Sequence, residues 1–368
     1  MVIYCKKCLM PDTRPRVVFK NGLCNGCITA SSKKSSNWKR REKEFKDLIY
    51  KHKKSSSTHD CIVPFSGGKD SAAIAHKLKF KFGLNPLLVT SSPLIPNDIA
   101  VHNREEMIKL GFDNIVIRPD QKISRYLAKR FFIERGNPKI HWEATKEAVP
   151  IGTAIKYNIP LIFYAEHGES EYGGLVLNKD STKRKDYTEI IEHIVGDNPE
   201  NWIDDIVKKK DLYHYQYPKA DEMKKAKLEI RYFGYFFKWS MYENYEYIKK
   251  KINFKTANNG RTEGSLTNFD SLDDKIDTLF YYMQYIKFGF GRCVRDSSRM
   301  IQNNVLTRKK ALYYVRKYDH EKPSEYFKEQ LNYLDLNKKE FNEIVDSHRN
   351  PEIWMYKKGH WKLKYPPK

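Results

Sequence analysis

The sequence predicts an α/β fold in which a parallel sheet stands between a small cysteine-rich head and a mostly helical region. Short apolar runs alternate with helix-length segments between residues 59 and 178, which is typical of parallel sheets with helical crossovers. Four of the six cysteines lie within the first 27 residues, and helical periodicity dominates from about residue 270 onward. These features divide the chain into three regions: residues 1–58, 59–178 and 179–368.

Two Cys-x-x-Cys pairs define the N-terminal head. Cys5 and Cys8 are followed, after fifteen intervening residues, by Cys24 and Cys27. Four thiolates at this spacing bind Zn²⁺ in a tetrahedron and stabilise a segment that is too small to form its own core. Because protein fills all four positions, we expect the zinc to be structural. A basic helix is expected to follow over about residues 29–58, where a serine-rich end marks the first boundary.

The charge of the chain restricts its partners and its location. The 368 residues carry a formal net charge of +22, and residues 1–58 contribute half of it, with 15 basic against 4 acidic side chains. An RNA partner would suit such a surplus of positive charge. We favour the interpretation that these charges lie on lysine-rich solvated helices, and we expect no nucleic-acid partner.

No apolar run approaches the ~18–20 residues that span a bilayer, and no signal peptide is recognisable. We therefore expect a cytoplasmic protein without membrane insertion.

A glycine-rich motif, called the glycine loop below, consists of Ser66, Gly67, Gly68, Lys69, Asp70 and Ser71. The apolar run at residues 61–63 predicts a buried strand before it, and residues 72–78 predict a helix after it. Backbone N–H groups at such a helix N-terminus bind phosphate, and the two glycines allow the close approach. Lys69 adds a cation, Asp70 is a ligand for Mg²⁺, and the two serines add hydroxyl donors. The motif differs from the Gly-x-x-x-x-Gly-Lys-[Ser/Thr] pattern of kinases and GTPases.

The alternation of strands and helices predicts where a ligand crevice lies. Further strands are expected at residues 86–90, 114–117 and 160–165, with helices over 98–110, 122–133 and 143–157. Ligands bind such sheets beyond the carboxyl ends of the strands. Residues 66–71, 90–92 and 166–174 should therefore line one crevice.

Two of these stretches supply further candidate residues. We expect Thr90 and Ser91 to lie beside the nucleotide. Residues 166–174 hold three carboxylates between glycines. Here Glu169 and Glu171 are expected to contact Mg²⁺ or substrate, while Gly173 and Gly174 permit close approach. The alternative is a solvated acidic turn.

Beyond residue 178 the pattern changes. A basic stretch with Lys179, Lys183, Arg184 and Lys185 is a candidate lid over phosphates. Helices are expected near residues 190–207, 219–227, 307–317 and 337–349, and the aromatic run 231–239 predicts a strand. Residues 271–274 are typical of a capping box before a helix.

Taken together, these motifs give a chain that resembles the N-acetyl sugar amidotransferases. This family belongs to the ATP pyrophosphatase (PP-loop) superfamily, which has an adenine nucleotide alpha hydrolase-like fold. The resemblance covers nearly the whole chain and is carried by the glycine loop and by residues 4–15, 159–162, 171–174, 272–275, 287–292 and 345–354. The sequence departs from the family at Tyr164-Ala165-Glu166-His167, where relatives have Trp-Gly-Glu-Asn. That loop should face the acceptor sugar.

The resemblance implies a reaction and a set of roles. An acetamido group of a bacterial N-acetylated sugar, either a nonulosonic acid or a nucleotide-linked diacetamido sugar, would become acetamidino during surface-polysaccharide or flagellin-glycan synthesis. ATP would adenylate the acetamido oxygen, and ammonia would then displace AMP. Lys69 and the loop amides would hold pyrophosphate, while Asp70 with Glu169 or Glu171 would hold Mg²⁺. Arg292 and Lys183 are candidates for the α-phosphate or a substrate carboxylate.

The source of ammonia implies a partner. No glutaminase triad is recognisable, because Cys61 and Cys293 lack a base partner in their sequence context. The resemblance therefore implies glutaminase and ammonia-channel subunits like those of imidazole glycerol phosphate synthase, docked on the basic head. One alternative is a PP-loop tRNA-modifying enzyme, which the charge favours but the absence of a catalytic cysteine pair opposes. The other is a non-catalytic zinc-ribbon protein, which would have no use for Lys69 and Asp70 together.

Overall fold

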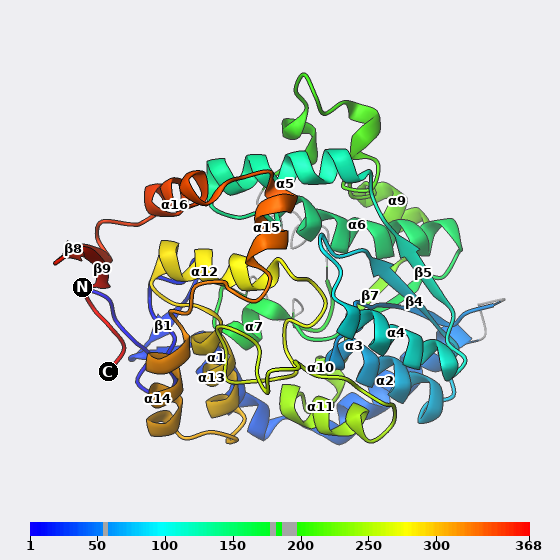
Figure 1. Ribbon diagram of the computed structural model, residues 1–368. Coiled ribbons are helices and arrows are strands. Elements are labelled where there is room, and N and C mark those ends of the chain that lie inside the picture. The colour runs from blue at the N-terminus through cyan, green and yellow to red at the C-terminus, as the bar shows by residue number, and fades with distance from the viewer. Residues whose placement is uncertain (54–57, 177–181, 186–196) are drawn as a thin grey trace.

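The computed structural model describes residues 1–53, 58–176, 182–185 and 197–368, and a five-stranded parallel sheet lies within it (Figure 1). The strand order is β5–β4–β3–β6–β7. The strands are β3 (Cys61–Pro64), β4 (Pro86–Ser91), β5 (Asn114–Ile117), β6 (Leu161–Tyr164) and β7 (Glu229–Tyr232). The chain places β4 and then β5 on one side of the central strand β3, and β6 and then β7 on its other side. The strand order therefore reverses between β3 and β6. The predicted α/β class is confirmed.

Both faces of the sheet are buried, as expected for parallel strands. Side chains alternate along β3. Cys61 and Val63 pack into one core cluster with α3 (Lys69–Phe80) and α11 (Met241–Lys249), whereas Ile62 packs into another with α6 (Ile140–Lys156). α4 (Asp98–Lys109) contributes to the first of these clusters, and α5 (Gln121–Arg135) packs beside α6. Helices on both sides therefore hold the glycine loop in place.

The N-terminal head is a short hairpin followed by helices. Its elements are β1 (Phe19–Lys20), β2 (Leu23–Cys24), α1 (Asn25–Ser32), the 3₁₀ helix η1 (Lys33–Ser35) and α2 (Trp38–Lys53). The single helix predicted over residues 29–58 is thus wrong, because the chain leaves helical geometry at Ser36, whose ψ is 136°. Residues 54–57, which make up most of the serine-rich stretch at the predicted boundary, lie outside the described residues.

The remaining elements are mostly helical, as predicted. They are α7 (Gly168–Tyr172), η3 (Pro199–Trp202), η4 (Lys209–Leu212), α9 (Ala220–Lys225), α10 (Phe233–Phe236), α12 (Asp277–Phe288), α13 (Arg292–Gln302), α14 (Arg308–Tyr318), α15 (Phe327–Leu334), α16 (Lys338–Ser347), β8 (Trp354–Lys357) and β9 (His360–Leu363). In Figure 1, α12, α13 and α14 lie on the same side of the molecule as β1 and α1 of the head.

Several local predictions for this part of the chain need correction. The run 231–239 is a strand only to Tyr232 and then turns into α10. Residues 271–274 do not cap a helix: α12 begins at Asp277, and the Asp274 carboxylate accepts from the backbone N–H groups of Leu94 and Ile95. Of the candidate lid, residues 182–185 are described, and they run antiparallel to β7. Residues 179–181, and the start of the helix expected at 190–207, lie outside the described residues.

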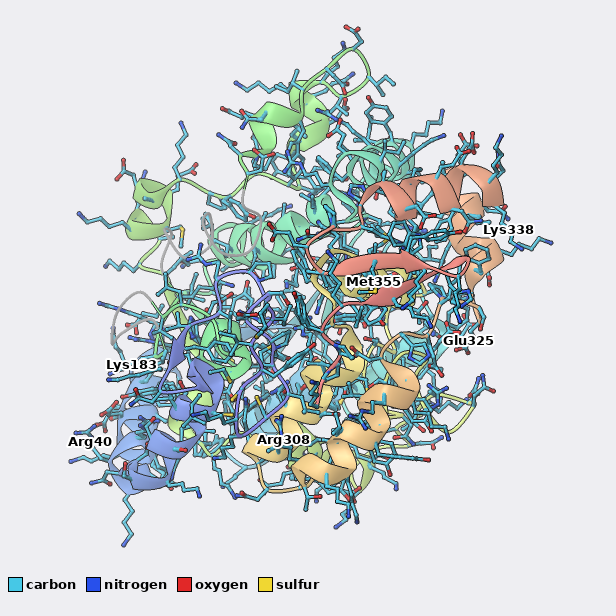
Figure 2. All side chains as sticks on the ribbon, turned by 90° about the vertical axis from the view of Figure 1, so that its left-hand side faces the viewer. Arg40, Lys183, Arg308, Glu325, Lys338 and Met355 are labelled. Carbon is cyan, nitrogen blue, oxygen red and sulfur yellow. The ribbon has the colours of Figure 1, made fainter. Side chains whose placement is uncertain are left out.

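The surface is densely charged. Figure 2 shows long polar side chains over the face that carries the head and the C-terminal helices, with Arg40 and Lys183 on one side and Lys338 on the other. A search of the described residues finds no helix with the length and apolar character that a membrane crossing requires.

Candidate active site

A cavity of about 650 Å³, called the central cavity below, lies at the carboxyl ends of β3 and β6. This is the point at which the strand order reverses, where open α/β sheets bind ligands. Its walls come from the glycine loop, from α6, from residues 163–172 and from residues 269–295. The volume lies within the range of about 300–1,000 Å³ that is usual for ligand pockets.

The glycine loop joins β3 to α3 in a conformation that needs glycine. Gly67 has φ +96°, and a Cβ atom there would lie 2.5 Å from the carbonyl oxygen of Ala100. Gly68 is the N-cap of α3, so helical backbone begins at Lys69. The loop thus brings the amino end of a 12-residue helix to the cavity wall, where N–H groups and the helix dipole favour an anion.

Lys69 is buried between two carboxylates. Its ammonium lies 2.9 Å from Asp70 Oδ2 and forms an ion pair with Asp270. Burial alone would lower the pKa of Lys69, but the Asp270 and Asp70 carboxylates raise it above its ordinary value. Burial likewise opposes ionisation of Asp270, yet Lys69 and Arg292 hold its pKa below the usual value. Lys69 therefore presents a permanent positive charge beside the glycine loop, as binding of a polyphosphate requires.

Two further carboxylates line the central cavity with Lys69 and Asp70. Burial raises the pKa of Glu166, the second residue after β6; Asp70 adds to the effect, and Arg299, at 3.5 Å, opposes it. Glu169 also lines the cavity, where its Oε2 lies 3.5 Å from Arg14 Nη1. Buried carboxylates that influence each other can share a divalent cation. Asp70 and Glu166 are the pair that would hold Mg²⁺.

Glu171 does not join this group. Its carboxylate forms an ion pair with Lys33 of η1 and lines a second cavity of about 240 Å³, on the side of the head. The helix α7, which the sequence analysis did not predict within residues 166–174, explains the difference. In α7 Glu169 and Glu171 are two positions apart and therefore point in different directions.

The other predicted site residues divide between the cavity and its surroundings. Ser91 lines the central cavity, but Thr90 is buried beside it and accepts a hydrogen bond from Asn114 Nδ2 at 3.0 Å. Gly173 and Gly174 approach the head instead: their carbonyls accept from Val18 N at 3.1 Å and from Asn25 Nδ2 at 2.8 Å. Lys183 pairs with Glu44 at 3.2 Å, away from the central cavity.

Three arginines on one side of α13 line or support the cavity. Arg292 and Arg295 lie on its wall, and Arg299 lies behind Tyr172, to whose hydroxyl it donates at 2.7 Å. Arg292 reaches Asp270 at 3.3 Å and Asp296 at 2.8 Å. Their spacing of three and four residues places the three guanidiniums on a single helix face. Only Arg292 was predicted from the sequence.

The opposite wall is aromatic and basic. Trp142 of α6 lies under Lys139, whose ammonium is 4.0 Å from the indole centroid. Lys185 reaches the cavity from the segment beside β7 and pairs with the buried Glu147. Flat rings flanked by cations can bind a purine or a sugar face together with its phosphates.

The four head cysteines converge on one point. All four are buried, and their sulfurs lie within 4.8 Å of one another, with Cys5 and Cys27 3.8 Å apart and Cys8 and Cys24 3.6 Å apart. Zn–S bonds of about 2.3 Å in a tetrahedron place sulfurs about 3.8 Å apart, so the donor set fits Zn²⁺. In addition, Arg308 donates to the backbone carbonyls of Cys5 and Cys8, which fixes the first knuckle against α14.

Comparison with known proteins identifies the C-terminal part of the chain. Residues 263–366 match the family model described as LPS biosynthesis protein WbpG-like, C-terminal domain. Residues 263–366, called the WbpG-like region below, are thus similar to that domain. This WbpG-like region supplies Asp270, Arg292 and Arg295 to the central cavity.

Other similarities are shorter or weaker. Over 87 residues the chain is 36% identical to an uncharacterized protein of Methanocaldococcus jannaschii, which is 23% of this chain and 31% of that protein, so less than a third of the relative is matched. A solved structure described as a predicted subunit of tRNA methyltransferase, from the same organism, is 30% identical over 28% of this chain and 53% of its own (TM-score 0.22). NMN synthetase from Francisella tularensis is 13% identical over 59% of this chain and 87% of its own (TM-score 0.27).

Sequence reasoning placed Glu166 in the crevice, within residues 166–174, but gave it no role. It did not place Arg14, Glu147, Asp270 or Arg295 there, nor Lys139 and Trp142 of the opposite wall. Arg295 carried a usable signal, because it continues the helical spacing that begins at Arg292. The others reach the cavity only through tertiary packing.

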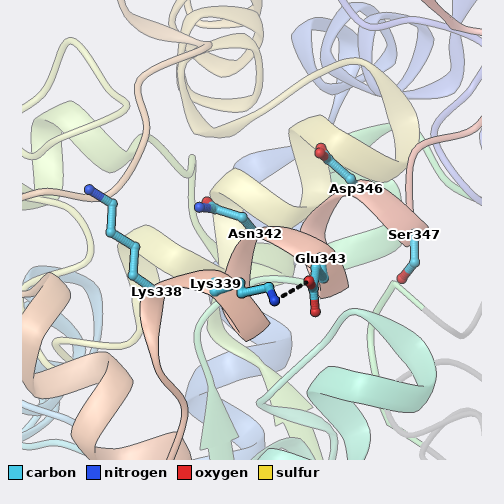
Figure 3. A pocket seen from close by; sticks show the side chains of 6 residues that line it. All are labelled: Lys338, Lys339, Asn342, Glu343, Asp346 and Ser347. Atoms are coloured by element: carbon cyan, nitrogen blue, oxygen red, sulfur yellow. Dashed lines mark ion pairs between the residues drawn. The ribbon is translucent and has the colours of Figure 1, made fainter.

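A shallow depression elsewhere on the surface has no such features. It runs along α16 and is lined by Lys338, Lys339, Asn342, Glu343, Asp346 and Ser347 (Figure 3). Lys339 and Glu343 form an exposed ion pair at 4.0 Å. These side chains are typical of a solvated helix face.

Proposed function

We propose that the protein is an ATP-dependent amidotransferase of lipopolysaccharide or related surface-glycan synthesis, which converts an acetamido group of an N-acetylated sugar into an acetamidino group. One observation carries the proposal: the glycine loop, with Lys69 and Asp70, opens into the same cavity as Asp270, Arg292 and Arg295 of the WbpG-like region. The loop proposed to bind ATP and the region similar to a lipopolysaccharide-biosynthesis protein therefore line the same cavity.

The proposed reaction takes place in this cavity in two steps. The acetamido oxygen attacks the α-phosphorus of ATP, so an O–P bond forms and the bond to the β-phosphate breaks, releasing pyrophosphate. Ammonia then attacks the imidate carbon; a C–N bond forms, the C–O bond breaks, and AMP departs with the acetamido oxygen. The protons lost by the ammonia and the amide nitrogen pass to solvent or remain on the amidine. An amide oxygen is a poor leaving group, and adenylation removes that barrier.

The roles of the chain follow from position and charge. Lys69 and the N–H groups at the start of α3 would hold the β- and γ-phosphates as pyrophosphate forms. Asp70 and Glu166 would hold Mg²⁺, which supplies charge neutralisation at the phosphates. Transfer to an adenylate depends mainly on such positioning and electrostatic stabilisation.

We propose that ammonia comes from a separate glutaminase. A glutaminase of the cysteine type needs an accessible, activated thiol. Cys61 and Cys293 are both buried, and burial raises the pKa of each thiol. The four head cysteines form the buried cluster proposed to bind zinc.

The decisive experiment follows the nucleotide product and the oxygen. The protein is incubated with ATP, Mg²⁺, ammonium and a panel of N-acetylated sugar acids and nucleotide sugars whose acetamido oxygen is ¹⁸O. We expect AMP that carries the label, pyrophosphate, and a sugar product about one mass unit below its unlabelled precursor, because O is replaced by NH. ADP as the product, or unlabelled AMP, would reject the proposal. A Lys69→Met variant serves as the background control.

A tRNA-modifying enzyme is the alternative that the charge of +22 favours. Filter binding with total tRNA at physiological salt separates the two proposals. Sub-micromolar binding together with tRNA-dependent release of AMP would support the alternative. Binding that is weak and disappears with added salt would leave the sugar as the substrate.

A further inference from the structure

Two guanidiniums from opposite ends of the sequence face the same part of the central cavity. Arg14 comes from the N-terminal head and Arg295 from α13, and both line the cavity wall. They are close enough to influence each other: burial lowers the pKa of Arg14, and the positive charge of Arg295 lowers it further. Like charges converging in a low-dielectric space are costly unless an anion lies between them.

The carboxylates nearby do not balance this pair. Arg14 has Glu169 at 3.5 Å. For Arg295, by contrast, the described residues include no ion-pair partner. Its guanidinium instead lies 4.5 Å from the ring centroid of Tyr172 and 5.3 Å from that of Tyr281. Stacking on two tyrosines fixes the plane of the guanidinium and leaves its N–H edge available to a ligand.

Both tyrosines are themselves held in place. The Tyr172 hydroxyl accepts from Arg299, and the Tyr281 hydroxyl accepts from Arg292. The buried Arg299 side chain pairs with Glu166 through Nη1 at 3.5 Å, but its Nε and Nη2 atoms have no hydrogen-bond partner among the described residues. The wall is therefore a preorganised cationic surface with more donors than the protein satisfies, which is the usual form of an oxyanion site.

We propose that Arg14 and Arg295 form an acceptor subsite that binds an oxyanion, a carboxylate or phosphate, carried by the sugar substrate. This inference rests on the proposed function, because it concerns the substrate of the same cavity. A planar guanidinium pairs with either oxyanion through two parallel N–H···O bonds. The glycine loop would hold the ATP phosphates at the other end, so the acceptor is oriented by a charge of its own.

The test is a binding experiment that needs no turnover. Three probes share an acetamido sugar: N-acetylneuraminic acid has a carboxylate, N-acetylglucosamine 1-phosphate has a phosphate, and N-acetylglucosamine is neutral. Calorimetric titration of the full chain with each probe should give at least about tenfold tighter binding for one charged probe than for the neutral one. The charged probe that binds more tightly identifies the oxyanion.

Variants then assign the preference to these residues. Arg295→Gln and Arg14→Gln should each reduce the preference at least about fivefold, while the affinity for ATP stays within about twofold. Arg295→Lys should recover only part of it, because an ammonium cannot bind bidentately. Arg40→Gln, which removes an exposed charge with 68% side-chain exposure, should change nothing.

Three results would overturn the proposal: no preference in the native protein, a preference that survives both Gln variants, or a loss confined to ATP binding. None of these depends on AMP formation. A protein that shows the preference but releases no AMP would contradict the proposed function and leave the subsite standing. Circular dichroism and zinc content exclude misfolding of the variants.

Discussion

Lys69 forms a buried ion pair with Asp270, which lies 201 residues further along the chain. This contact joins the glycine loop to the start of the WbpG-like region. It makes the glycine loop and α13 parts of one electrostatic unit, because Asp270 also lies 3.3 Å from Arg292.

Replacing Asp270 by Asn should therefore lower stability and nucleotide binding together. Lys69 and Arg292 would each lose a buried counter-charge, and breaking such a pair costs about 3 kcal/mol of unfolding free energy. Urea unfolding measures this loss. Asp335→Asn is the matched control, because the Asp335 carboxylate is 84% exposed in its pair with Lys129 and should contribute less than about 0.5 kcal/mol. Equal stabilities for the two variants would contradict the expectation.

A Gly67→Ala substitution should be far more harmful than Gly68→Ala. At Gly67 the left-handed φ and the carbonyl of Ala100 both oppose a Cβ atom, whereas a Cβ atom at Gly68 meets only Ser66 Oγ, at 3.3 Å. We expect Gly67→Ala to cost about 1–3 kcal/mol and Gly68→Ala less than half as much. Thermal unfolding of both variants, in the absence of nucleotide, measures the difference. A Gly67→Ala protein as stable as the native one would show that the loop relaxes.

Glu166 and Glu171 should behave differently as metal ligands. Glu166→Gln removes a carboxylate from the cavity and should reduce AMP formation about 100-fold at limiting Mg²⁺. Glu171→Gln affects an ion pair with Lys33 outside the cavity and should change the rate less than about threefold. Titrating Mg²⁺ at saturating ATP distinguishes the two. If Glu171→Gln raised the Mg²⁺ requirement instead, the assignment of Glu166 would be wrong.

The head should contain one zinc ion per chain, on which its fold depends. Cys24→Ser removes a ligand from the buried cluster, whereas Cys61→Ser alters an equally buried thiol within β3. We expect the first variant to lose its metal and the second to keep it, as measured by elemental mass spectrometry. Chelation of the native protein should expose the head to protease before the sheet. Full metal content in Cys24→Ser would contradict the assignment.

Asp319 should make stability fall as pH rises from about 4 to about 7. Its carboxylate accepts from Gly291 N at 2.7 Å and Val294 N at 2.9 Å at the start of α13, yet burial raises its pKa from 3.8 to about 7. The folded protein thus retains a proton that the unfolded chain loses, so this stabilisation is complete below pH 4 and disappears as pH approaches 7. Urea unfolding of the native protein and of Asp319→Asn at pH 4.5 and pH 7.5 tests this. The difference in unfolding free energy should shrink at the higher pH; a constant difference would contradict it.

The parts of the site that the sequence predicts correctly are local ones. The strand before the glycine loop, the helix after it and the spacing of the head cysteines follow from patterns a few residues long. Such patterns depend on backbone preference and on side-chain alternation, which act within a single element. The prediction of a four-cysteine cluster and a parallel sheet needed nothing further.

The errors have a common physical cause. Glu171 and Gly174 were assigned to the cavity because they follow a strand, but α7 turns them toward the head, which was not placed relative to the sheet. Asp270 and Arg14 reach the cavity from segments that no local pattern connects with Lys69. Contacts between distant segments depend on packing, and a single sequence does not specify which packing is adopted.

The separation of Lys69 and Asp270 also affects how the chain is made. A ribosome that adds about 5–20 residues each second completes Asp270 roughly 10–40 s after Lys69. During that interval the lysine of the nascent chain lacks its Asp270 counter-charge, and β6 and β7, which pair beyond β3, are synthesised only part-way through it. Chaperones that shield unpaired strand edges would therefore be most valuable to this protein before its last hundred residues are translated.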